Sequence, residues 1–229
     1  MSDLKPEKRD IFDEWSLLRM DFLTNLGRLI LPPGHWEHGS SQGTVYLTFD
    51  DGPSPHTTAK LLELLSEEEV SATFFLIGSH AGRHPELVES IAANGHAIGS
   101  HSLSHKIMPL LSLKEIESEI HRANIILRDL LGFTPKLFRP PYGLVDKRAA
   151  RYLEELAMKI VYWGAVPEDW GNIGAERVAQ RVLRRLTDGT IVVLHEQRRI
   201  AEQTLAATKQ IIRAGKQRGF SFKTLETLC

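Results

Sequence analysis

The sequence has a single cysteine, and that cysteine is its last residue. A disulfide framework is therefore excluded, and so is a zinc or iron–sulfur site built from cysteines. No apolar run reaches the roughly 18–20 residues that a membrane-spanning helix needs. An excess of one charge sign is also missing, because 28 Lys and Arg stand against 29 Asp and Glu. Without a basic field to attract a phosphate backbone, nucleic acid is not an expected partner.

An export signal is also missing at the start, where acids are mixed with bases and no apolar core follows. As the sequence stands, this predicts a cytoplasmic or membrane-apposed protein, or an exported one whose signal has been removed. Residues 12–31 instead predict an amphipathic helix, because apolar side chains recur at helical spacing: Trp15, Leu18, Phe22, Leu26 and Leu29. The polar face is not basic, so we expect this helix to pack on the domain and membrane contact to be disfavoured.

A stretch rich in Gly, Pro and Ser at 31–43 divides the chain into an N-terminal helix with its linker (1–43) and a domain at 44–229. In the domain, short β-rich runs alternate with helical patterns. The predicted strands are 44–50, 71–78, 96–101, 136–142, 158–164, 190–196 and 220–225. The predicted helices are 55–69, 85–94, 111–132, 146–157, 175–186 and 200–218. Strands separated by crossover helices predict an α/β fold with a parallel sheet.

Polar residues interrupt the apolar pattern where the predicted strands end. They are Asp50, Asp51, His101, Arg139 and His195, with Asp169 just beyond the fifth strand. In barrel folds the carboxyl ends of the strands form the functional face. This confinement to one rim is more informative than any single residue, since each one alone is usually a turn residue, an ion-pair member or a solvated histidine.

Two motifs together predict a metal site. TFDDGP at 48–53 places Asp50 and Asp51 side by side, and HSLSH at 101–105 places His101 and His105 four residues apart. Two imidazoles and one carboxylate leave open coordination positions, which is typical of a catalytic metal rather than a structural one. The same ligands also suit non-haem iron in an oxygenase.

TFDDGP, HSLSH, RPPYG, EDW and LH occur in this order, and the chain from about 44 to 226 resembles the polysaccharide deacetylase family, with its NodB-homology domain (carbohydrate esterase family 4). The resemblance implies a distorted (β/α) barrel with about seven parallel strands. It also implies metal-dependent removal of acetyl groups from a polysaccharide, typically at N-acetylglucosamine units, so that the partner is an acetylated carbohydrate. The oligomeric state is not implied.

The resemblance assigns roles to individual positions. Asp50 matches the general base and His195 the general acid, while Arg139 orients the base and Asp169 tunes the acid. The matching metal ligands are Asp51, His101 and His105, which would hold one divalent ion, with zinc favoured and Co, Ni, Mn or Fe as alternatives. The matching substrate-binding residues are Pro141, Tyr142 (through its backbone N–H, an oxyanion donor), Trp170 and Val193.

Two positions depart from the family pattern. Val166 stands where the fourth motif usually has its first Asp, which predicts a change in substrate fit rather than loss of activity. Glu196 follows the acid where Asp is common, a minor difference. Among the histidines without a motif, His35 and His38 in the linker are favoured to border a substrate groove, although solvated loop histidines are the default.

Three other functions compete with a carbohydrate deacetylase. A relative that hydrolyses a non-peptide C–N or ester bond in a small molecule would differ only in the shape of its pocket. A non-haem iron oxygenase is disfavoured, because its scaffold is usually all-β and needs neither the second Asp nor a separate His acid. A catalytically silent carbohydrate-binding relative would be expected to lack Asp50 or His195, and the sequence has both.

Overall fold

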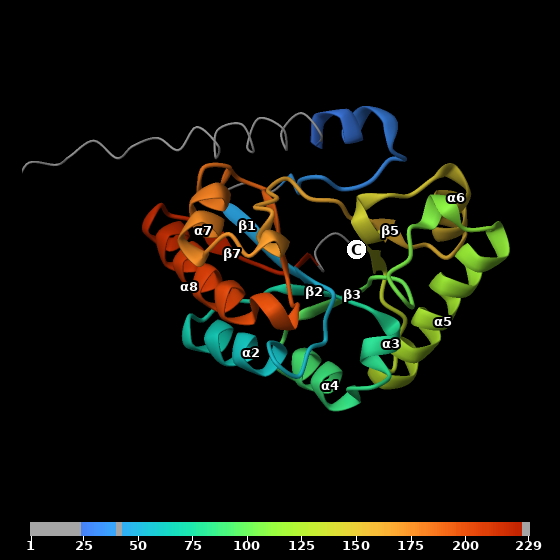
Figure 1. Cartoon of the computed structure of the whole chain (residues 1–229), viewed down its shortest axis with the longest axis horizontal. Coiled ribbons are helices and arrows are strands. Elements are labelled where there is room, and N and C mark those ends of the chain that lie inside the picture. Colours follow the sequence, from blue (N-terminus) through green and yellow to red (C-terminus); the bar gives the residue numbers. More distant parts are fainter. Residues whose placement is uncertain (1–23, 40–42, 226–229) are drawn as a thin grey trace, which may run out of the picture. The chain divides into compact units, whose positions relative to one another are not determined.

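The computed structural model describes residues 24–39 and 43–225. Its centre is one sheet of seven strands (Figure 1). The strands are β1 Thr44–Asp50, β2 Thr73–Leu76, β3 Ala97–Ser100, β4 Leu137–Phe138, β5 Lys159–Ile160, β6 Ile191–His195 and β7 Ser221–Phe222. They are ordered β5-β4-β3-β2-β1-β6, with β7 paired to β1, and every pair is parallel. The predicted α/β fold with seven parallel strands is therefore confirmed.

The sheet curls until its two ends meet. Beyond β5, the Gly164 N–H donates to the Ile191 carbonyl at 2.9 Å, and Ala165 forms a parallel bridge with Val192 of β6. The segment after the last strand on one side therefore pairs with the strand at the other side. Curling of this kind gathers the carboxyl ends of the strands around one opening, which places functional side chains from distant parts of the chain within reach of one another.

Helices occupy the connections between strands (Figure 1). They are α2 Thr58–Glu67, α3 Gly78–Ala81, α4 Pro85–Ala93, α5 Leu113–Leu131, α6 Lys147–Glu155, α7 Ala175–Leu183 and α8 Ala201–Gln217. The predicted ends of the longest one are confirmed: Ser112 and Glu115 form a capping box, and Gly132 closes the helix at φ 78°. The main core lies between β1, β2 and β6 and the helices α2, α4, α7 and α8. No helix in the described part of the chain is long and apolar enough to cross a membrane.

Several predicted strands are shorter in the structure. The one predicted at 136–142 ends at Phe138, because Pro140 and Pro141 have no N–H to donate to a neighbouring strand. The one predicted at 158–164 ends at Ile160, after which the chain pairs with His35 of the linker instead. The strand predicted at 71–78 ends at Leu76, and the one-turn helix α3 that follows it was not predicted.

The chain divides into two compact units, residues 1–30 and 31–229. In the first, residues 24–30 form a helix on which Leu26 and Leu29 are exposed, while Trp15, Leu18 and Phe22 lie outside the described residues. Packing of the predicted stripe on the domain stays a prediction. In the second unit, the linker residue Trp36 stacks on Tyr162 with ring centroids 4.3 Å apart, so residues 31–39 are part of this unit.

Candidate active site

The polar residues predicted at strand ends do meet at one rim. Asp50 ends β1 and His195 ends β6, and the two are paired residues in the parallel register of these strands. His101 directly follows β3, and Arg139 directly follows β4. Because the strands are parallel neighbours, each of these side chains leaves the same edge of the sheet.

Asp51, His101 and His105 form a cluster whose ligand atoms all lie within 4.8 Å of one another. The Asp51 Oδ1 atom is 3.3 Å from His105 Nε2 and 3.6 Å from His101 Nε2. Two donors bound to one tetrahedral zinc ion, each about 2.0–2.1 Å from the metal, would lie about 3.3 Å apart. Asp51 Oδ1 is also buried without a hydrogen-bond partner. The donor set and its spacing therefore fit a divalent metal, and no other such group occurs within the described ranges.

The protonation of the cluster also suits a metal. His101 Nδ1 lies 2.7 Å from the Arg139 carbonyl oxygen, which can only accept, so Nδ1 carries the proton and the lone pair of Nε2 faces Asp51. Burial and the neighbouring His101 lower the pKa of His105, which keeps this ring in the neutral form that binds metal. Burial alone would raise the pKa of Asp51, but the surrounding histidines outweigh it and lower the pKa, so the carboxylate stays ionised.

The loop that carries His105 depends on a residue that the motifs do not include. Glu119 of α5 is buried, and its carboxylate accepts hydrogen bonds from the Ser104 N–H at 2.9 Å and the Ser104 hydroxyl at 2.7 Å. This support matters because His105 has a φ of 58°, a conformation that costs a non-glycine residue on the order of 1–3 kcal/mol. The signal in the sequence is an acid on the apolar face of a helix, beside Ile116 and Ile120.

Asp50 is held by a fully buried arginine. Arg139 Nη1 donates to Asp50 Oδ1 at 2.8 Å and to the Thr48 hydroxyl at 2.6 Å, and Nη2 donates to the Tyr162 carbonyl at 2.8 Å. The other carboxylate oxygen, Oδ2, lies 4.0 Å from His101 Nε2 and so faces the metal-ligand cluster. This arrangement fixes the carboxylate in place and leaves one oxygen available to the site.

His195 is held by a buried carboxylate in the same way. Asp169, in the 3₁₀ turn η3 (Asp169–Gly171), accepts from the His195 ring Nδ1 and from the His195 backbone N–H, both at 2.8 Å. Burial alone would lower the pKa of His195, but the Asp169 carboxylate outweighs it and raises the pKa to about 9. A bound divalent cation would oppose this rise. Gln203 of α8 fixes the turn by donating to the Asp169 carbonyl at 2.8 Å.

A pocket of about 280 Å³ opens between these groups. Its apolar and aromatic lining is formed by Tyr142, Trp163, Val166, Trp170 and Val193. Three of them, Tyr142, Trp170 and Val193, were predicted to bind substrate, and a fourth is Val166, the position that departs from the family pattern and is buried in the wall. Pro141 is buried in the turn η2 (Pro141–Gly143) and does not line the pocket.

Trp163 was not anticipated, and its place depends on a close contact. A Cβ atom on Gly143, which has a φ of 70°, would lie 2.6 Å from the Trp163 ring, so only glycine fits in the RPPYG turn. In the same turn, the Tyr142 backbone N–H donates no hydrogen bond within the described part of the chain. This donor is therefore available to a substrate.

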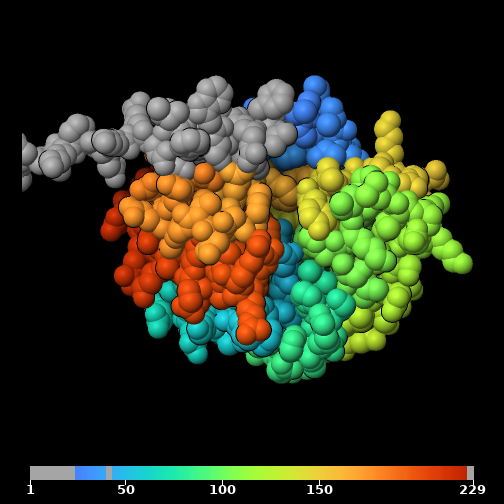
Figure 2. Space-filling view, in the orientation of Figure 1, coloured from blue at the N-terminus to red at the C-terminus, as the bar shows by residue number. Residues whose placement is uncertain are grey.

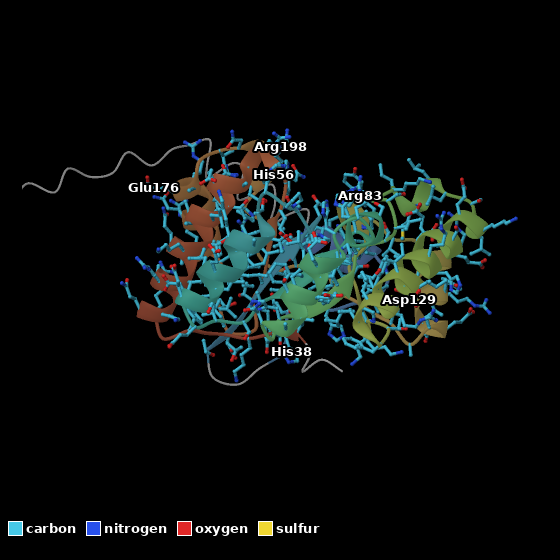
Figure 3. All side chains as sticks on the ribbon, turned by 90° about the horizontal axis from the view of Figure 1, so that it is seen from below. His38, His56, Arg83, Asp129, Glu176 and Arg198 are labelled. Atoms are coloured by element: carbon cyan, nitrogen blue, oxygen red, sulfur yellow. The ribbon has the colours of Figure 1, made fainter. Side chains whose placement is uncertain are left out.

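A larger cleft of about 650 Å³ adjoins the pocket. The two share Asp51, His105, Tyr142 and Gln197, so they are continuous. The histidines that line the cleft are His80, His84 and His105, not the linker residues His35 and His38 that were favoured. Hydrogen bonds hold both linker residues at other places: the His35 N–H donates to the Ile160 carbonyl at the end of β5, and the His38 N–H donates to the Gly189 carbonyl before β6. In Figure 3, His38 lies on the opposite side of the view from His56, Arg83 and Arg198.

Glu196, the second departure from the motif pattern, lies beneath the loop that follows Asp51. Its side chain is buried, and one carboxyl oxygen accepts from the Thr58 hydroxyl. Burial raises the pKa of Glu196 to about 8, so the carboxyl is mainly protonated at neutral pH. The side chain lies against Gly52, where a Cβ atom would collide with it.

Comparisons with known proteins agree with this geometry. Residues 38–161 match the family model for polysaccharide deacetylases. The chain is 36% identical over 184 residues to the peptidoglycan-N-acetylglucosamine deacetylase PgdA of Listeria monocytogenes, covering 80% of this chain but only 38% of that protein. It is 33% identical to a chitooligosaccharide deacetylase of Rhizobium leguminosarum bv. trifolii, covering 82% and 93% of the two chains. A crystal structure of a peptidoglycan N-acetylglucosamine deacetylase superposes with a TM-score of 0.81 at 33% identity, covering 84% and 91%.

Proposed function

Because the chain belongs to the polysaccharide deacetylase family, we propose that it removes acetyl groups from the N-acetylated sugars of a polysaccharide or oligosaccharide. The observation that carries this proposal is the placement of two ion pairs, Arg139–Asp50 and Asp169–His195, beside the cluster of Asp51, His101 and His105. The relatives compared above are named as deacetylases of peptidoglycan or chitooligosaccharides.

The reaction is hydrolysis of an amide: one water is consumed, the C–N bond of the acetamide breaks, and acetate and a free amine form. Asp51, His101 and His105 would hold a divalent ion, which would supply Lewis-acid polarisation of the acetyl carbonyl and would lower the pKa of a bound water. Two imidazoles and one carboxylate favour zinc, with Co, Ni, Mn or Fe as alternatives for the same ligands.

The chain's own residues move the protons. Asp50 Oδ2, which faces the cluster, accepts the proton of the attacking water, while Arg139 holds Oδ1. The His195 Nε2 proton goes to the leaving nitrogen, since Nδ1 is engaged with Asp169. The free Tyr142 N–H donates to the oxyanion that develops on the acetyl oxygen. Trp170 and Val193 form an apolar wall suited to the methyl group.

The cleft favours a glycan over a small-molecule substrate. A small molecule would fill the pocket of about 280 Å³, whereas the continuous cleft of about 650 Å³ leaves room for further sugar units beside the acetylated one.

The test is to incubate the zinc-loaded protein with N-acetylated chito-oligosaccharides, peptidoglycan fragments and O-acetylated xylan, and to measure released acetate and new free amines. We expect acetate and amine in equal amounts from the N-acetylated substrates, and a matched loss of both in His101→Ala. Acetate release that persists in the chelated protein, or turnover of simple amides but of no glycan, would contradict the proposal.

A further inference from the structure

The carboxylate Asp51 is held by hydrogen bonds at its backbone and at one of its two side-chain oxygens. Its φ of 71° is a conformation that a non-glycine residue adopts only when its surroundings impose it. The His80 ring donates from Nδ1 to the Asp51 carbonyl at 2.9 Å, since a carbonyl can only accept. The Gln197 amide donates from Nε2 to Asp51 Oδ2 at 3.0 Å. Within the described residues, Oδ1 is thus the carboxylate oxygen left without a hydrogen-bond partner.

The amide of Gln197 is itself oriented by a second side chain. Arg199 Nε donates to Gln197 Oε1 at 3.3 Å, and Arg199 Nη2 donates to the Trp170 carbonyl at 2.7 Å. A flipped amide would bring two donors together at Arg199 and two acceptors together at Asp51, so only one orientation satisfies both neighbours. Arg199 and Gln197 therefore connect the Trp170 carbonyl to the Asp51 carboxylate by consecutive hydrogen bonds.

The backbone on both sides of Gln197 is fixed. The Glu196 N–H donates to the Asp50 carbonyl at 3.0 Å, and the N–H of the buried Ile200 donates to the Gln197 carbonyl at 3.1 Å, where the turn η4 (Arg198–Ile200) begins. Figure 2 shows this C-terminal part of the chain, in orange and red, facing the middle part, in green, across a hollow. The amide therefore comes from a part of the chain that supplies none of the three metal ligands.

We propose that Gln197 is a positioning residue that makes Asp51 bind the metal through Oδ1 alone, and that Arg199 orients Gln197 for this task. The proposal rests on the metal site of the proposed function. A carboxylate can bind a metal through one oxygen or through both. With Oδ2 kept by Gln197, the protein offers three donors, which leaves coordination positions for a water and the acetyl oxygen. A carboxylate bound through both oxygens would occupy one of these positions.

The neighbouring Arg198 provides a matched control. Arg198 and Arg199 are both exposed and lie in the same turn. In the described part of the chain, however, only Arg199 of these two donates to Gln197. Replacing either arginine removes the same charge at nearly the same distance from the metal ligands, so a difference between the two variants reports the hydrogen bond rather than the charge.

The experiment measures the zinc affinity of the full chain by competition with a chromophoric chelator, in the absence of substrate. The variants are Gln197→Met, which keeps the length of the side chain and removes the amide donor, Arg199→Met, and the double variant, with Arg198→Met as the control. Thermal unfolding of the chelated proteins shows whether each variant folds. Because Arg199 is exposed, Arg199→Met tests the same connection if Gln197→Met fails to fold.

We expect Gln197→Met to weaken zinc binding about 10- to 100-fold, the usual loss when a residue that holds a metal ligand by a hydrogen bond is replaced. Arg199→Met should weaken it about 2- to 5-fold, because exposed charged groups contribute little. In the Gln197→Met background the same change should have no further effect, since Arg199 acts through Gln197. Arg198→Met should bind zinc as the wild type does.

The way in which Asp51 binds is read from the visible spectrum of the protein loaded with Co²⁺, whose absorption weakens as the coordination number rises. At saturating Co²⁺ we expect weaker absorption in Gln197→Met than in the wild type, because the released Oδ2 joins Oδ1 on the metal. Wild-type zinc affinity and a wild-type spectrum in Gln197→Met would overturn the proposal. Equal losses from Arg199→Met in both backgrounds would show that Arg199 does not act through Gln197.

These measurements need no turnover, so they separate this inference from the proposed function. Wild-type zinc affinity in His101→Ala would overturn the ligand assignment and the proposed function with it. Zinc binding that is lost in His101→Ala but unchanged in Gln197→Met would overturn only the role of Gln197. Zinc binding that depends on Gln197, in a protein that releases no acetate from any N-acetylated glycan, would support the role of Gln197 and overturn the deacetylase.

Discussion

Two groups of charged side chains meet at the rim, and they differ in whether their polar atoms have hydrogen-bond partners within the protein. Arg139 with Asp50 forms a fully buried pair and Asp169 with His195 a partly buried one, each with a hydrogen bond of 2.8 Å. In the metal-ligand cluster, by contrast, Asp51 Oδ1 is buried without a hydrogen-bond partner, 3.3 Å from the nearest imidazole nitrogen. Unpaired buried polar groups are costly, and here two imidazole nitrogens lie within 3.6 Å of the unpaired oxygen, so the cluster fits a bound cation.

The two groups differ in what positions them: the ion pairs depend on folding alone, whereas the cluster is suited to a bound metal ion. The paired groups are positioned as soon as the sheet forms, because β1, β4 and β6 carry three of the four residues or lie next to them. A cation bound by the cluster would stabilise it further. Substitutions in the ion pairs and substitutions in the metal-ligand cluster should therefore differ in their effects on metal content and on stability.

The largest effect is expected from breaking the cluster. His101→Ala should remove a ligand and lower metal affinity by more than about 100-fold, the upper range seen when only the partner of a ligand is removed. Activity should fall to background at micromolar zinc. Metal content after gel filtration and acetate release are the measurements, with His121→Ala on the exposed face of α5 as control. Full occupancy and activity in His101→Ala would show that the ligand assignment is wrong.

Asp50→Asn tests the pair formed by Arg139 and Asp50. We expect the rate to fall roughly 10²- to 10⁴-fold, the usual contribution of a positioned proton-transfer group. Metal content should stay near that of the wild type, because Asp50 pairs with Arg139 rather than with the ligands. The amide oxygen can still accept from Arg139, so the variant should fold with lowered thermal stability. Wild-type turnover in this variant would exclude Asp50 as the base.

Asp169→Asn probes the second pair through pH. Asp169 raises the pKa of His195 to about 9, so the acid stays charged below that pH and loses its proton above it. Removing the carboxylate charge should move the alkaline limb of the pH–rate profile to lower pH and reduce the maximal rate. The stability that the pair contributes is complete below about pH 6.5 and is lost as the pH rises past about 9.

A bound metal shifts the alkaline limb in wild type and variant alike, so the difference between them remains the readout. Profiles are measured at equal metal content on an N-acetylated substrate. An alkaline limb that stays in place in Asp169→Asn would mean that Asp169 only holds the fold of the turn.

The smallest expected effect is a change in thermal stability on zinc binding. Zinc at 100 times its dissociation constant should stabilise the protein by about 2.7 kcal/mol, which raises Tm by roughly 5–10 °C for a domain of this size. Differential scanning calorimetry after chelation and after zinc addition measures this shift. In Asp51→Asn the shift should shrink strongly, while in Asp50→Asn it should persist. Equal shifts in both variants would remove the distinction between the two carboxylates.

The sequence predicts the parts of this structure that depend on local patterns and short motifs. Apolar runs alternating with helical patterns predict the parallel sheet, and the motifs place Asp50, Asp51, His101, Arg139 and His195 at strand ends. The end of β5 depends instead on a partner far away in the chain, because Val161 pairs with His35. Trp163 and Gln203 serve the site through contacts that no spacing in the sequence reveals, whereas Glu119 is marked only as an acid on the apolar face of a helix.

Arg139 has one further consequence, because its two ends have different partners. Its guanidinium group holds Asp50, whereas its carbonyl oxygen fixes the ring of His101. Any residue at this position retains the carbonyl, but only arginine supplies the fork. Divergence at position 139 would therefore leave the proposed base Asp50 without its partner, while the backbone carbonyl that fixes the His101 ring remains, so base positioning and ligand orientation are separable at one residue.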